Sequence, residues 1–338
     1  MKCVVAGGAG FIGSHLVTKL LAHNNHVIVL DDFSSGMMDN LHHVKSQSNL
    51  EIKTCDITDA IPPMDGVDMI FHLAASANPT DYEKDPLSSL SVNSVGNEQL
   101  IECANSSQAR YMYFSSSEIY GHHNPIPNNG LSEECMSHLV LNQKRSPYFI
   151  GKIFGESLVG HLCQKYSLQH IIIRPFNVYG TRMDKKTCYG RVIPNFMNWA
   201  HRNEPLRIHG DGIQERSFCH VDDFIDCIMR IVQKPSWEHS VVNIGNPEPV
   251  KIRELAKLVI GVTRSLSSLL YTQRYKYEPK YRTPNIHRVH EWLHWRPRIQ
   301  LQEGLIELIE NSESILDPEE LESDKLISQC EDSIKLSS

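Results

Sequence analysis

A glycine-rich segment near the start of the chain constrains the fold more than any other feature. It reads GGAGFIG at residues 7–13 and directly follows the apolar run Lys2–Ala6. A helical pattern, Phe11–Leu21, and a second apolar run, Val27–Leu30, come next. This order of strand, tight turn, helix and strand predicts a βαβ unit at the beginning of the chain.

The alternation of strands and helices continues beyond this unit. Further apolar runs at Asp68–Leu73, Arg110–Ser115 and Gln169–Arg174 predict buried strands. Helical patterns lie between them, around Leu87–Asn105 and Tyr148–Tyr166. Continuous apolar strands that alternate with helices are typical of a parallel sheet covered on both faces. We therefore predict an α/β fold with a Rossmann-type, doubly wound parallel sheet.

The composition of the sequence changes after Pro175, where segments rich in Gly, Pro, Arg and His alternate with helical patterns. We expect a nucleotide-binding domain over residues 1–175 and a smaller substrate lobe over residues 176–310. The chain is expected to return to the first domain near residues 215–245, through the apolar run Val241–Ile244. Residues 311–338 form an acidic tail.

Composition excludes several classes of protein. The chain has 338 residues, 41% of them hydrophobic, which is enough for a large core and argues against disorder throughout. The net charge is −7, and the tail has eight acidic residues and two lysines, a net of −6, which leaves −1 for the body. This balance argues against a nucleic-acid partner.

The chain also lacks the signals of a membrane or secreted protein. No apolar run approaches the length of a membrane span, and no secretory signal pattern opens the sequence. The nine cysteines include no CxxC pair, which favours free thiols over a disulfide framework. We therefore expect a cytoplasmic protein without a membrane partner.

The glycine segment predicts a cofactor site. Gly7, Gly10 and Gly13 would let the backbone approach a pyrophosphate at the N-terminus of the following helix. A purely structural glycine turn is the alternative, which the surrounding strand–helix–strand pattern disfavours. Asp31 ends the second strand, where a carboxylate would bond the adenosine ribose and repel a 2′-phosphate, so we expect NAD rather than NADP. Asp56 could reach the adenine edge or serve as a helix N-cap.

Two further segments carry groups suited to acid–base chemistry. Tyr148 and Lys152 stand four residues apart in a predicted helix, which places both on one face. An ammonium near a phenol lowers the phenol's pKa and makes the phenolate available as a base. The segment SSSEIYG at 115–121 leaves a predicted strand at its carboxyl end, where doubly wound sheets bind ligands.

Taken together, five motifs resemble the extended short-chain dehydrogenase/reductase family. They are GGAGFIG, HLAA at 72–75, SSSEIYG, YFIGK at 148–152 and RPFNVYG at 174–180, and they appear in order over roughly residues 1–310. Within the family the chain is similar to the nucleotide-sugar epimerases, dehydratases and decarboxylases. The resemblance implies an NAD-dependent enzyme with a nucleotide-sugar substrate, most simply a UDP-sugar. It also implies a homodimer formed through the helices that contain Tyr148 and Leu87–Asn105.

The resemblance assigns a role to each of the principal residues. Tyr148 would take the proton of the sugar 4-hydroxyl while C4 gives a hydride to NAD. Lys152 would bind the nicotinamide ribose, Ser116 the 4-oxygen, and Glu118 would position the ring or a water molecule. The cofactor contacts would be Gly7, Gly10, Phe11, Ile12, Gly13, Asp31, Asp56, Ile57, Leu73, Ala74, Ala75, Asn93, Tyr148 and Lys152. The substrate contacts would be Ser117, Arg145, Asn177, Arg191, Val192, Asn195, Arg216 and Arg282.

The details of the motifs favour one reaction. The pair Ser117-Glu118 resembles that of UDP-glucuronate decarboxylases, and also that of GDP-mannose 4,6-dehydratases. Arg145, the segments at 182–196 and 210–218, and the R-x-P segment at 282–284 lean toward the decarboxylase. We therefore expect decarboxylation of UDP-glucuronate to UDP-xylose. A UDP-sugar 4-epimerase, an NDP-sugar 4,6-dehydratase and a non-catalytic dinucleotide sensor remain alternatives.

One motif points to different chemistry. Residues 290–294 spell HExxH, the pattern of a zinc-protease helix. The segment is similar to the family's C-terminal helix, in which Trp292, Leu293 and Trp295 would be packing residues. We therefore predict no metal site.

Overall fold

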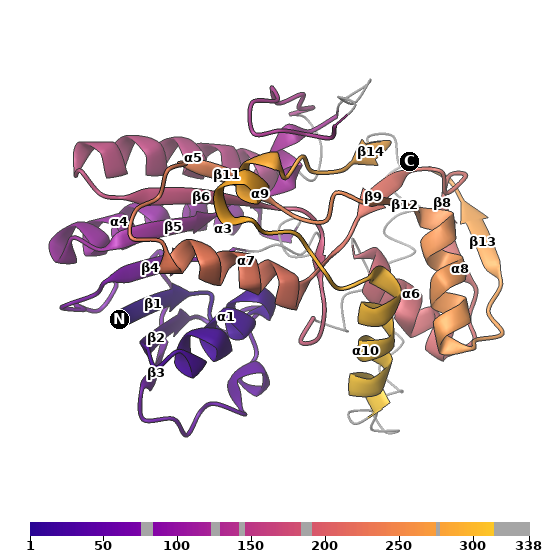
Figure 1. Cartoon of the computed structure of the whole chain (residues 1–338), viewed down its shortest axis with the longest axis horizontal. Coiled ribbons are helices and arrows are strands. Elements are labelled where there is room, and N and C mark those ends of the chain that lie inside the picture. Colours follow the sequence, from indigo (N-terminus) through magenta and orange to yellow (C-terminus); the bar gives the residue numbers. More distant parts are fainter. Residues whose placement is uncertain (76–83, 123–128, 142–145, 184–190, 275–277, 314–338) are drawn as a thin grey trace.

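The computed structural model of the chain describes residues 1–75, 84–122, 129–141, 146–183, 191–274 and 278–313. Figure 1 shows two unequal parts side by side, a larger one around a central sheet and a smaller one that contains α6, α8 and α10. No helix in these ranges is long and apolar enough to cross a membrane.

The central sheet has seven strands, all paired in parallel, in the order β11-β6-β5-β4-β1-β2-β3. The strands are β1 (Lys2–Ala6), β2 (His26–Asp31), β3 (Leu50–Thr54), β4 (Met69–His72), β5 (Arg110–Phe114), β6 (His170–Pro175) and β11 (Val241–Ile244). The order reverses between β1 and β4, which is the switch point of a doubly wound sheet. The predicted α/β, Rossmann-type fold is confirmed.

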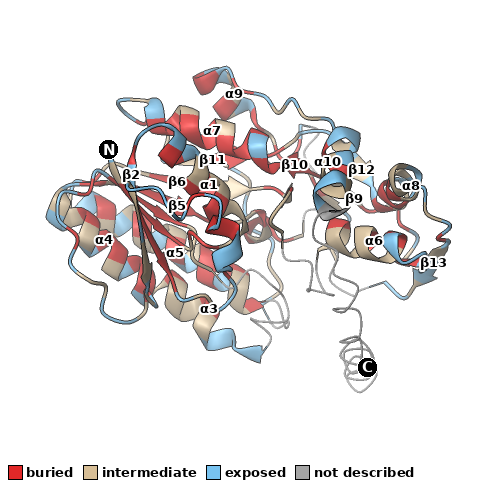
Figure 2. Ribbon diagram, turned by 90° about the horizontal axis from the view of Figure 1, so that it is seen from below, coloured by how far each residue is buried: buried red, intermediate tan, exposed pale blue. Residues whose placement is uncertain are grey.

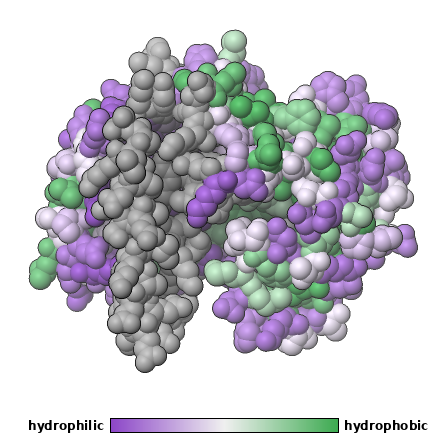
Figure 3. All heavy atoms as spheres, turned by 180° about the vertical axis from the view of Figure 1, so that it is seen from behind, coloured by the Kyte–Doolittle hydropathy of each residue, from purple (hydrophilic) through white to green (hydrophobic). Residues whose placement is uncertain are grey.

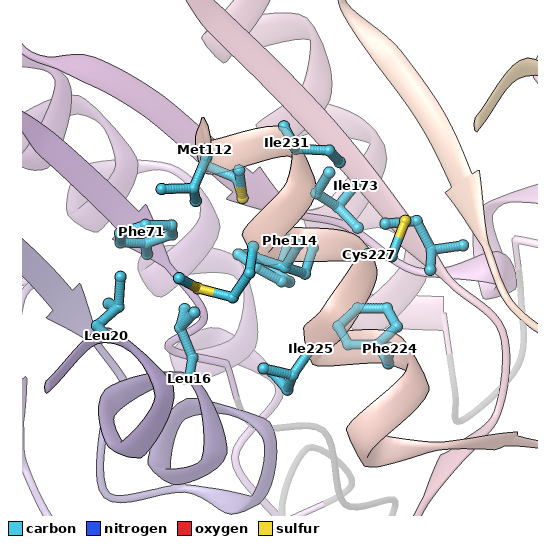
Figure 4. Packing of buried hydrophobic residues seen from close by; sticks show 14 of the residues in the cluster. Leu16, Leu20, Phe71, Met112, Phe114, Ile173, Phe224, Ile225, Cys227 and Ile231 are labelled. Atoms are coloured by element: carbon cyan, nitrogen blue, oxygen red, sulfur yellow. The ribbon is translucent and has the colours of Figure 1, made fainter. Parts of the chain in front are cut away.

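Helices cover both faces of this sheet, as Figure 2 shows. One face carries α1 (Phe11–Ala22), α7 (Val221–Gln233) and α9 (His287–Leu293), and the other carries α3 (Pro86–Asn93), α4 (Val95–Ser107) and α5 (Ser146–Lys165). On the first face, Leu16 of α1 and Phe224 of α7 pack with Phe71 and Phe114 of the sheet (Figure 4). On the second face, Leu100 and Val159 pack with the buried residues of the same strands.

The helix expected around Leu87–Asn105 is in fact two helices, so that prediction was wrong in part. The break falls at Ser94, whose backbone leaves the helical region with φ −109° and ψ −81°. The Ser94 hydroxyl donates to the carbonyl of Leu90 at 2.8 Å. A side chain that bonds the backbone in this way competes with regular helix geometry, and the apolar pattern alone did not reveal it.

The smaller part is built from short strands and three helices. The strands are β7 (Val178–Tyr179), β8 (Leu206–His209), β9 (Glu215–Ser217), β10 (Cys219–His220), β12 (Pro249–Lys251), β13 (Leu269–Thr272) and β14 (Tyr281–Arg282). The helices are α6 (Val192–His201), α8 (Ile252–Thr263) and α10 (Leu301–Glu313). Short 3-10 helices follow β2 and β5, η1 (Met38–Leu41) and η2 (Ser117–Tyr120). The separate core of this part includes Phe196, Ile208 and Leu255. Since α10 extends to Glu313, the predicted tail from 311 overlaps its end, and residues 314–338 lie outside the described residues.

Candidate active site

The glycine turn lies at the switch point, against the end of β4. Gly7 has φ +80°, and a Cβ there would come within 2.6 Å of the backbone nitrogen of Ala74. A Cβ at Gly13 would come within 2.0 Å of the Gly7 carbonyl oxygen. Gly10 is the N-cap of α1 and has no side chain to cap the first-turn N–H groups. Only glycines permit this close turn, which leaves a helix N-terminus open to a negatively charged ligand.

Asp31 closes the other side of the turn. Its carboxylate accepts hydrogen bonds from the backbone N–H groups of Ala9, at 2.8 Å, and Phe33, at 3.0 Å. Burial raises the pKa of this carboxyl, and the two backbone donors oppose the shift. The carboxylate is thus fixed directly beside the glycine turn, as a ribose acceptor requires.

The remaining predicted cofactor residues occupy different settings. Leu73, Ala74 and Ala75 follow β4 beside the turn, and Phe11 and Ile12 begin α1, where both pack against the core. The side chain of Ile57 is buried against α4, because a Cβ at Gly96 would meet it at 2.7 Å. The carboxylate of Asp56 accepts from the N–H and hydroxyl of Thr58, both at 2.8 Å, so it stabilises a local turn.

Lys152 is the most deeply buried of the predicted catalytic groups. Its side chain lies in α5, one turn after Tyr148, and is 2% exposed. The ammonium donates to the carbonyl oxygen of Phe114 at 2.8 Å and lies 5.0 Å from the centroid of the Tyr113 ring. Burial lowers the pKa of Lys152 to about 7, and the nearby Glu156 carboxylate partly opposes that shift.

A buried polar network lies behind Lys152 that the sequence did not predict. The Tyr113 hydroxyl donates to the side-chain oxygen of Asn93 at 2.6 Å, and the Asn93 amide donates to the Ser89 carbonyl at 2.7 Å. Asn93, predicted to contact the cofactor, is therefore fully buried and directed to protein groups. His72 lies beside the network, within 3.0 Å of Asn97, and burial lowers its pKa to about 3. Glycines at 151 and 155, one turn apart on α5, were the one signal of close packing here.

The SSSEIYG segment leads from β5 into η2. The Ser116 hydroxyl caps η2 by accepting from the Glu118 N–H at 3.1 Å, and Ser117 is buried. The Glu118 carboxylate forms an ion pair with the guanidinium of Arg282, which is 5% exposed. Two predicted site segments, 164 residues apart in the sequence, are therefore in direct contact.

Two predicted substrate arginines lie side by side in the small lobe. Arg282 of β14 is the register partner of Arg216 of β9, and like charges in that position repel. Each arginine has its own carboxylate: Arg282 pairs with Glu118, and Arg216 pairs with Glu278 at 3.1 Å. Glu278 was not predicted, because no local pattern marks a partner that only the strand register brings near.

Of the other predicted substrate residues, Asn177 contacts the strand of Arg216, three lie at one end of α6, and one lies outside the described residues. Asn177 has φ +35°, and its amide donates to the Ser217 carbonyl at 2.9 Å. Arg191, Val192 and Asn195 lie at the beginning of α6. Arg145 lies outside the described residues.

Comparison with known proteins decides the family. The model of the NAD dependent epimerase/dehydratase family matches residues 3–245. The chain belongs to this family. The prediction of an NAD-dependent enzyme is thereby confirmed at the level of the family.

Individual relatives of this chain support the assignment to the epimerase/dehydratase family. UDP-glucuronic acid decarboxylase 2 of Arabidopsis thaliana is 35% identical over 308 residues, which cover 90% of this chain and 66% of the relative. UDP-glucuronic acid decarboxylase 5 of the same plant is 34% identical, with coverages of 90% and 87%. The solved structure of UDP-glucose 4-epimerase from Thermotoga maritima aligns with a TM-score of 0.84 and 28% identity, over 94% of this chain and 100% of that one. The chain thus spans just under two thirds of the first relative's length.

The glycine turn and Asp31 fit NAD, which is the cofactor of the family. The glycine turn is a cradle that any Cβ at Gly7 or Gly13 would fill, and it opens beside the fixed carboxylate of Asp31. Asp31, by its charge, disfavours a cofactor with a 2′-phosphate.

The HExxH segment does not form a zinc-protease helix. The α9 helix ends at Leu293, and His294 has the left-handed φ of +49°. Trp292 and Trp295 are buried, as expected of packing residues. A different group, His220, Asp222 and Glu307, brings possible ligand atoms together. His220 is the N-cap of α7 and lies 3.4 Å from the Glu307 carboxylate, so these residues link α7 to α10.

Proposed function

We propose that this chain is an NAD-dependent UDP-glucuronate decarboxylase, which forms UDP-xylose through a 4-keto intermediate. The observation that carries the proposal is the ion pair between Glu118 and Arg282. It joins the Ser-Glu pair and the R-x-P segment, which are two of the parts of the sequence that resemble decarboxylases. Two relatives that bear the decarboxylase name align over 90% of this chain, which supports the same assignment.

The chemistry of the substrate explains why an oxidation comes first. A 4-keto-glucuronate is a β-keto acid, so its carboxylate can leave as CO2 and the electron pair passes into an enolate on the 4-oxygen. The ring carbon that lost CO2 then takes a proton. NAD, when bound, accepts the hydride of C4 in the first step and returns it in the last, so that no cofactor is consumed.

Each catalytic residue handles a proton or a charge in this sequence. Tyr148 takes the proton of the 4-hydroxyl in the oxidation and gives it back in the reduction. Ser116 donates a hydrogen bond to the 4-oxygen, which is where negative charge develops in the enolate. The Lys152 ammonium, one helical turn from Tyr148, stabilises the phenolate form and binds the nicotinamide ribose.

Most of the proposed contacts to the nucleotide sugar come from the small lobe. Arg282 and Arg216 give positive charge to the diphosphate, and Glu118 positions the sugar ring or a water molecule. Asn177 and Asn195, with Arg191 and Val192 near the start of α6, complete the proposed nucleotide-sugar site. Both arginines are held by carboxylates in this structure, so substrate binding would exchange at least part of those ion pairs for phosphate oxygens.

Two other outcomes share the first oxidation. A 4-epimerase would return the hydride to the opposite face of the ketone, and likeness to the Thermotoga maritima epimerase favours this as the second candidate. A 4,6-dehydratase would instead eliminate water. A dinucleotide sensor would bind NAD and turn over nothing, which is disfavoured because Ser116, Tyr148 and Lys152 are all present.

Mass spectrometry separates these candidates. The protein is incubated with NAD and, in separate reactions, UDP-glucuronate, UDP-glucose, UDP-GlcNAc and dTDP-glucose. We expect loss of CO2 from UDP-glucuronate and no mass change in the other sugars. In Tyr148→Phe the rate should fall by about a hundredfold or more while NAD still binds. Loss of water, or isomerisation without mass change, would replace the decarboxylase with the dehydratase or the epimerase.

We also propose that two copies associate through the face that carries α3, α4 and α5. Leu87 is 70% exposed and Phe154 is 51% exposed, and Val95 and Ile150 are exposed as well. Figure 3 shows this side of the molecule, where apolar side chains appear among polar ones. Large apolar side chains that remain exposed on packed helices are favourable positions for a subunit interface. Seven of the nine cysteines lie among the described residues, and these seven are free thiols, which supports the cytoplasmic location that we propose.

A further inference from the structure

The ring of Tyr113 packs against Lys152 at a place where the fold leaves little room. Tyr113 lies on β5 and is fully buried, although an aliphatic side chain would be usual in a central parallel strand. A Cβ at residue 155 of α5 would come within 2.2 Å of the Tyr113 hydroxyl oxygen, so a glycine there admits the ring. Asn93 accepts the hydroxyl's hydrogen bond at 2.6 Å. The hydroxyl end of the ring is therefore fixed between α5 and the Asn93 side chain.

The ring faces the Lys152 ammonium, and the carboxylate that also acts on this ammonium is shared with a second cation. Lys152 Nζ lies 5.0 Å from the ring centroid, which is within the range of a cation–π interaction. Its neighbour in sequence, Glu156, is already engaged by Arg174 of β6 at 2.7 Å. The other titratable groups nearby are Tyr148 on α5 and His72 on β4, and His72 is neutral because burial lowers its pKa to about 3.

We propose that Tyr113 is a positioning residue for Lys152, whose ring face holds the ammonium in place and stabilises its charge. The π-face of an aromatic ring attracts a cation most strongly where water is excluded, as it is here. The carbonyl of Phe114, the next residue on β5, directs the same ammonium by a hydrogen bond at 2.8 Å. Adjacent residues of one strand thus fix Lys152 from two sides. The catalytic consequence rests on the proposed function, in which Lys152 supports the Tyr148 phenolate.

The chain contains a matched control for this proposal. Tyr111 is on the same strand, two residues earlier, so its side chain points to the same face of the sheet. It is also fully buried, and its hydroxyl donates to Asn97 on α4 at 2.7 Å. Truncating Tyr111 therefore reproduces the loss of a buried, hydrogen-bonded phenol without removing the ring that faces Lys152.

The direct test is the titration of Lys152 by NMR in the full chain. Lysines are labelled with ¹³C at the ε carbon, and the Lys152 signal is assigned by its absence in Lys152→Met. In Tyr113→Leu we expect the titration midpoint to move to lower pH, with proton affinity about threefold to tenfold weaker. Tyr113→Phe, which keeps the ring, and Tyr111→Leu should both titrate like the wild type. An unchanged midpoint in Tyr113→Leu, or an equal shift in Tyr113→Phe or Tyr111→Leu, would overturn the proposal.

A second measurement covers the case in which Tyr113→Leu does not fold. A trifluorinated phenylalanine at position 113 keeps the shape of the Tyr113→Phe ring but removes most of its negative face. The Lys152 midpoint should fall below that of Tyr113→Phe, and equal midpoints would refute the role of the ring.

Kinetics then connect the ring to catalysis. We expect the alkaline limb of the kcat profile to move to lower pH in Tyr113→Leu, with an unchanged KM for the nucleotide sugar. A wild type that leaves UDP-glucuronate intact would refute the proposed function, whereas the NMR midpoint would still decide the role of Tyr113. An unchanged alkaline limb in an active Tyr113→Leu would refute the catalytic part of this inference.

Discussion

At the scale of the residue, the proposed site depends on buried charges that lower the stability of the folded protein. Lys152 is buried with one backbone acceptor and one aromatic face, and the Arg216 and Arg282 pair needs a carboxylate for each guanidinium. A charge that is buried in this way lowers stability unless its partners compensate. Such a cost is expected at functional positions, where a neutral side chain would pack better but could not act.

Replacing Lys152 with methionine should therefore stabilise the ligand-free protein while it abolishes turnover. The pKa of Lys152 falls from 10.5 to about 7 on folding, so between these values the unfolded chain binds the extra proton. The wild type consequently gains stability as pH rises from 7 toward 10.5 and is penalised most below pH 7. We expect the advantage of Lys152→Met to be about 3 kcal/mol larger at pH 6 than at pH 9. Urea denaturation at both pH values measures it, and an advantage that grows with pH would contradict the assignment.

At the scale of the element, helix α5 and strand β5 fit one another through small residues. A Cβ added at Gly151 would lie 2.9 Å from the carbonyl oxygen of Ser89. A Cβ added at Gly155 would lie 2.2 Å from the hydroxyl oxygen of Tyr113. A Cβ added at Gly160 of the same helix would meet no atom of another element within 4 Å. The helix therefore contains two glycines that packing requires and one that it does not.

The glycines of α5 make a matched pair of predictions. Gly155→Ala should destabilise the protein by about 1–3 kcal/mol, because the methyl group overlaps the Tyr113 hydroxyl. Gly160→Ala should stabilise it by about 0.5–1 kcal/mol, because alanine favours a helix and meets no neighbour. Thermal denaturation measures both. Adding Tyr113→Phe to Gly155→Ala should restore part of the loss, and a full loss in the double variant would show that the contact is not the cause.

The elements also show what a sequence can predict. The strands were predictable because continuous apolar runs reveal burial on both faces, and the bounds of β11 match the predicted range. The glycine turn and the Tyr148–Lys152 spacing were predictable because their chemistry lies within a few residues. The break at Ser94, the inward direction of Asn93 and the pairing of Arg216 with Glu278 were not, because each depends on contacts between distant segments.

At the scale of the whole molecule, the two parts meet where distant segments of the chain converge. Glu118 leaves the sheet at the end of β5 and contacts Arg282 of the small lobe. The glycine turn opens at the switch point of the same sheet. Under the proposed function, this arrangement would bring a cofactor on one part and a nucleotide sugar on the other to a common boundary, where Tyr148 and Ser116 would act.

The proposed dimer is a prediction at this scale. Phe154 projects from α5 with half of its surface exposed, and a charge there would oppose burial between two copies. Phe154→Asp should halve the mass measured by light scattering at micromolar concentration. Leu266→Asp, an equally drastic change at a site that is 90% exposed in the small lobe, should leave the mass unchanged. A monomeric wild type would refute the dimer.

We propose that the chain oxidises, decarboxylates and reduces one sugar with the same hydride. This proposal is tested most directly by UDP-glucuronate deuterated at C4, with product mass and NMR spectra recorded alongside absorbance from NADH. We expect UDP-xylose that keeps its deuterium at C4, with loss of CO2 and no net formation of NADH. Deuterium lost from C4, NADH released together with a 4-keto product, or a product that keeps its carboxylate would contradict the proposal.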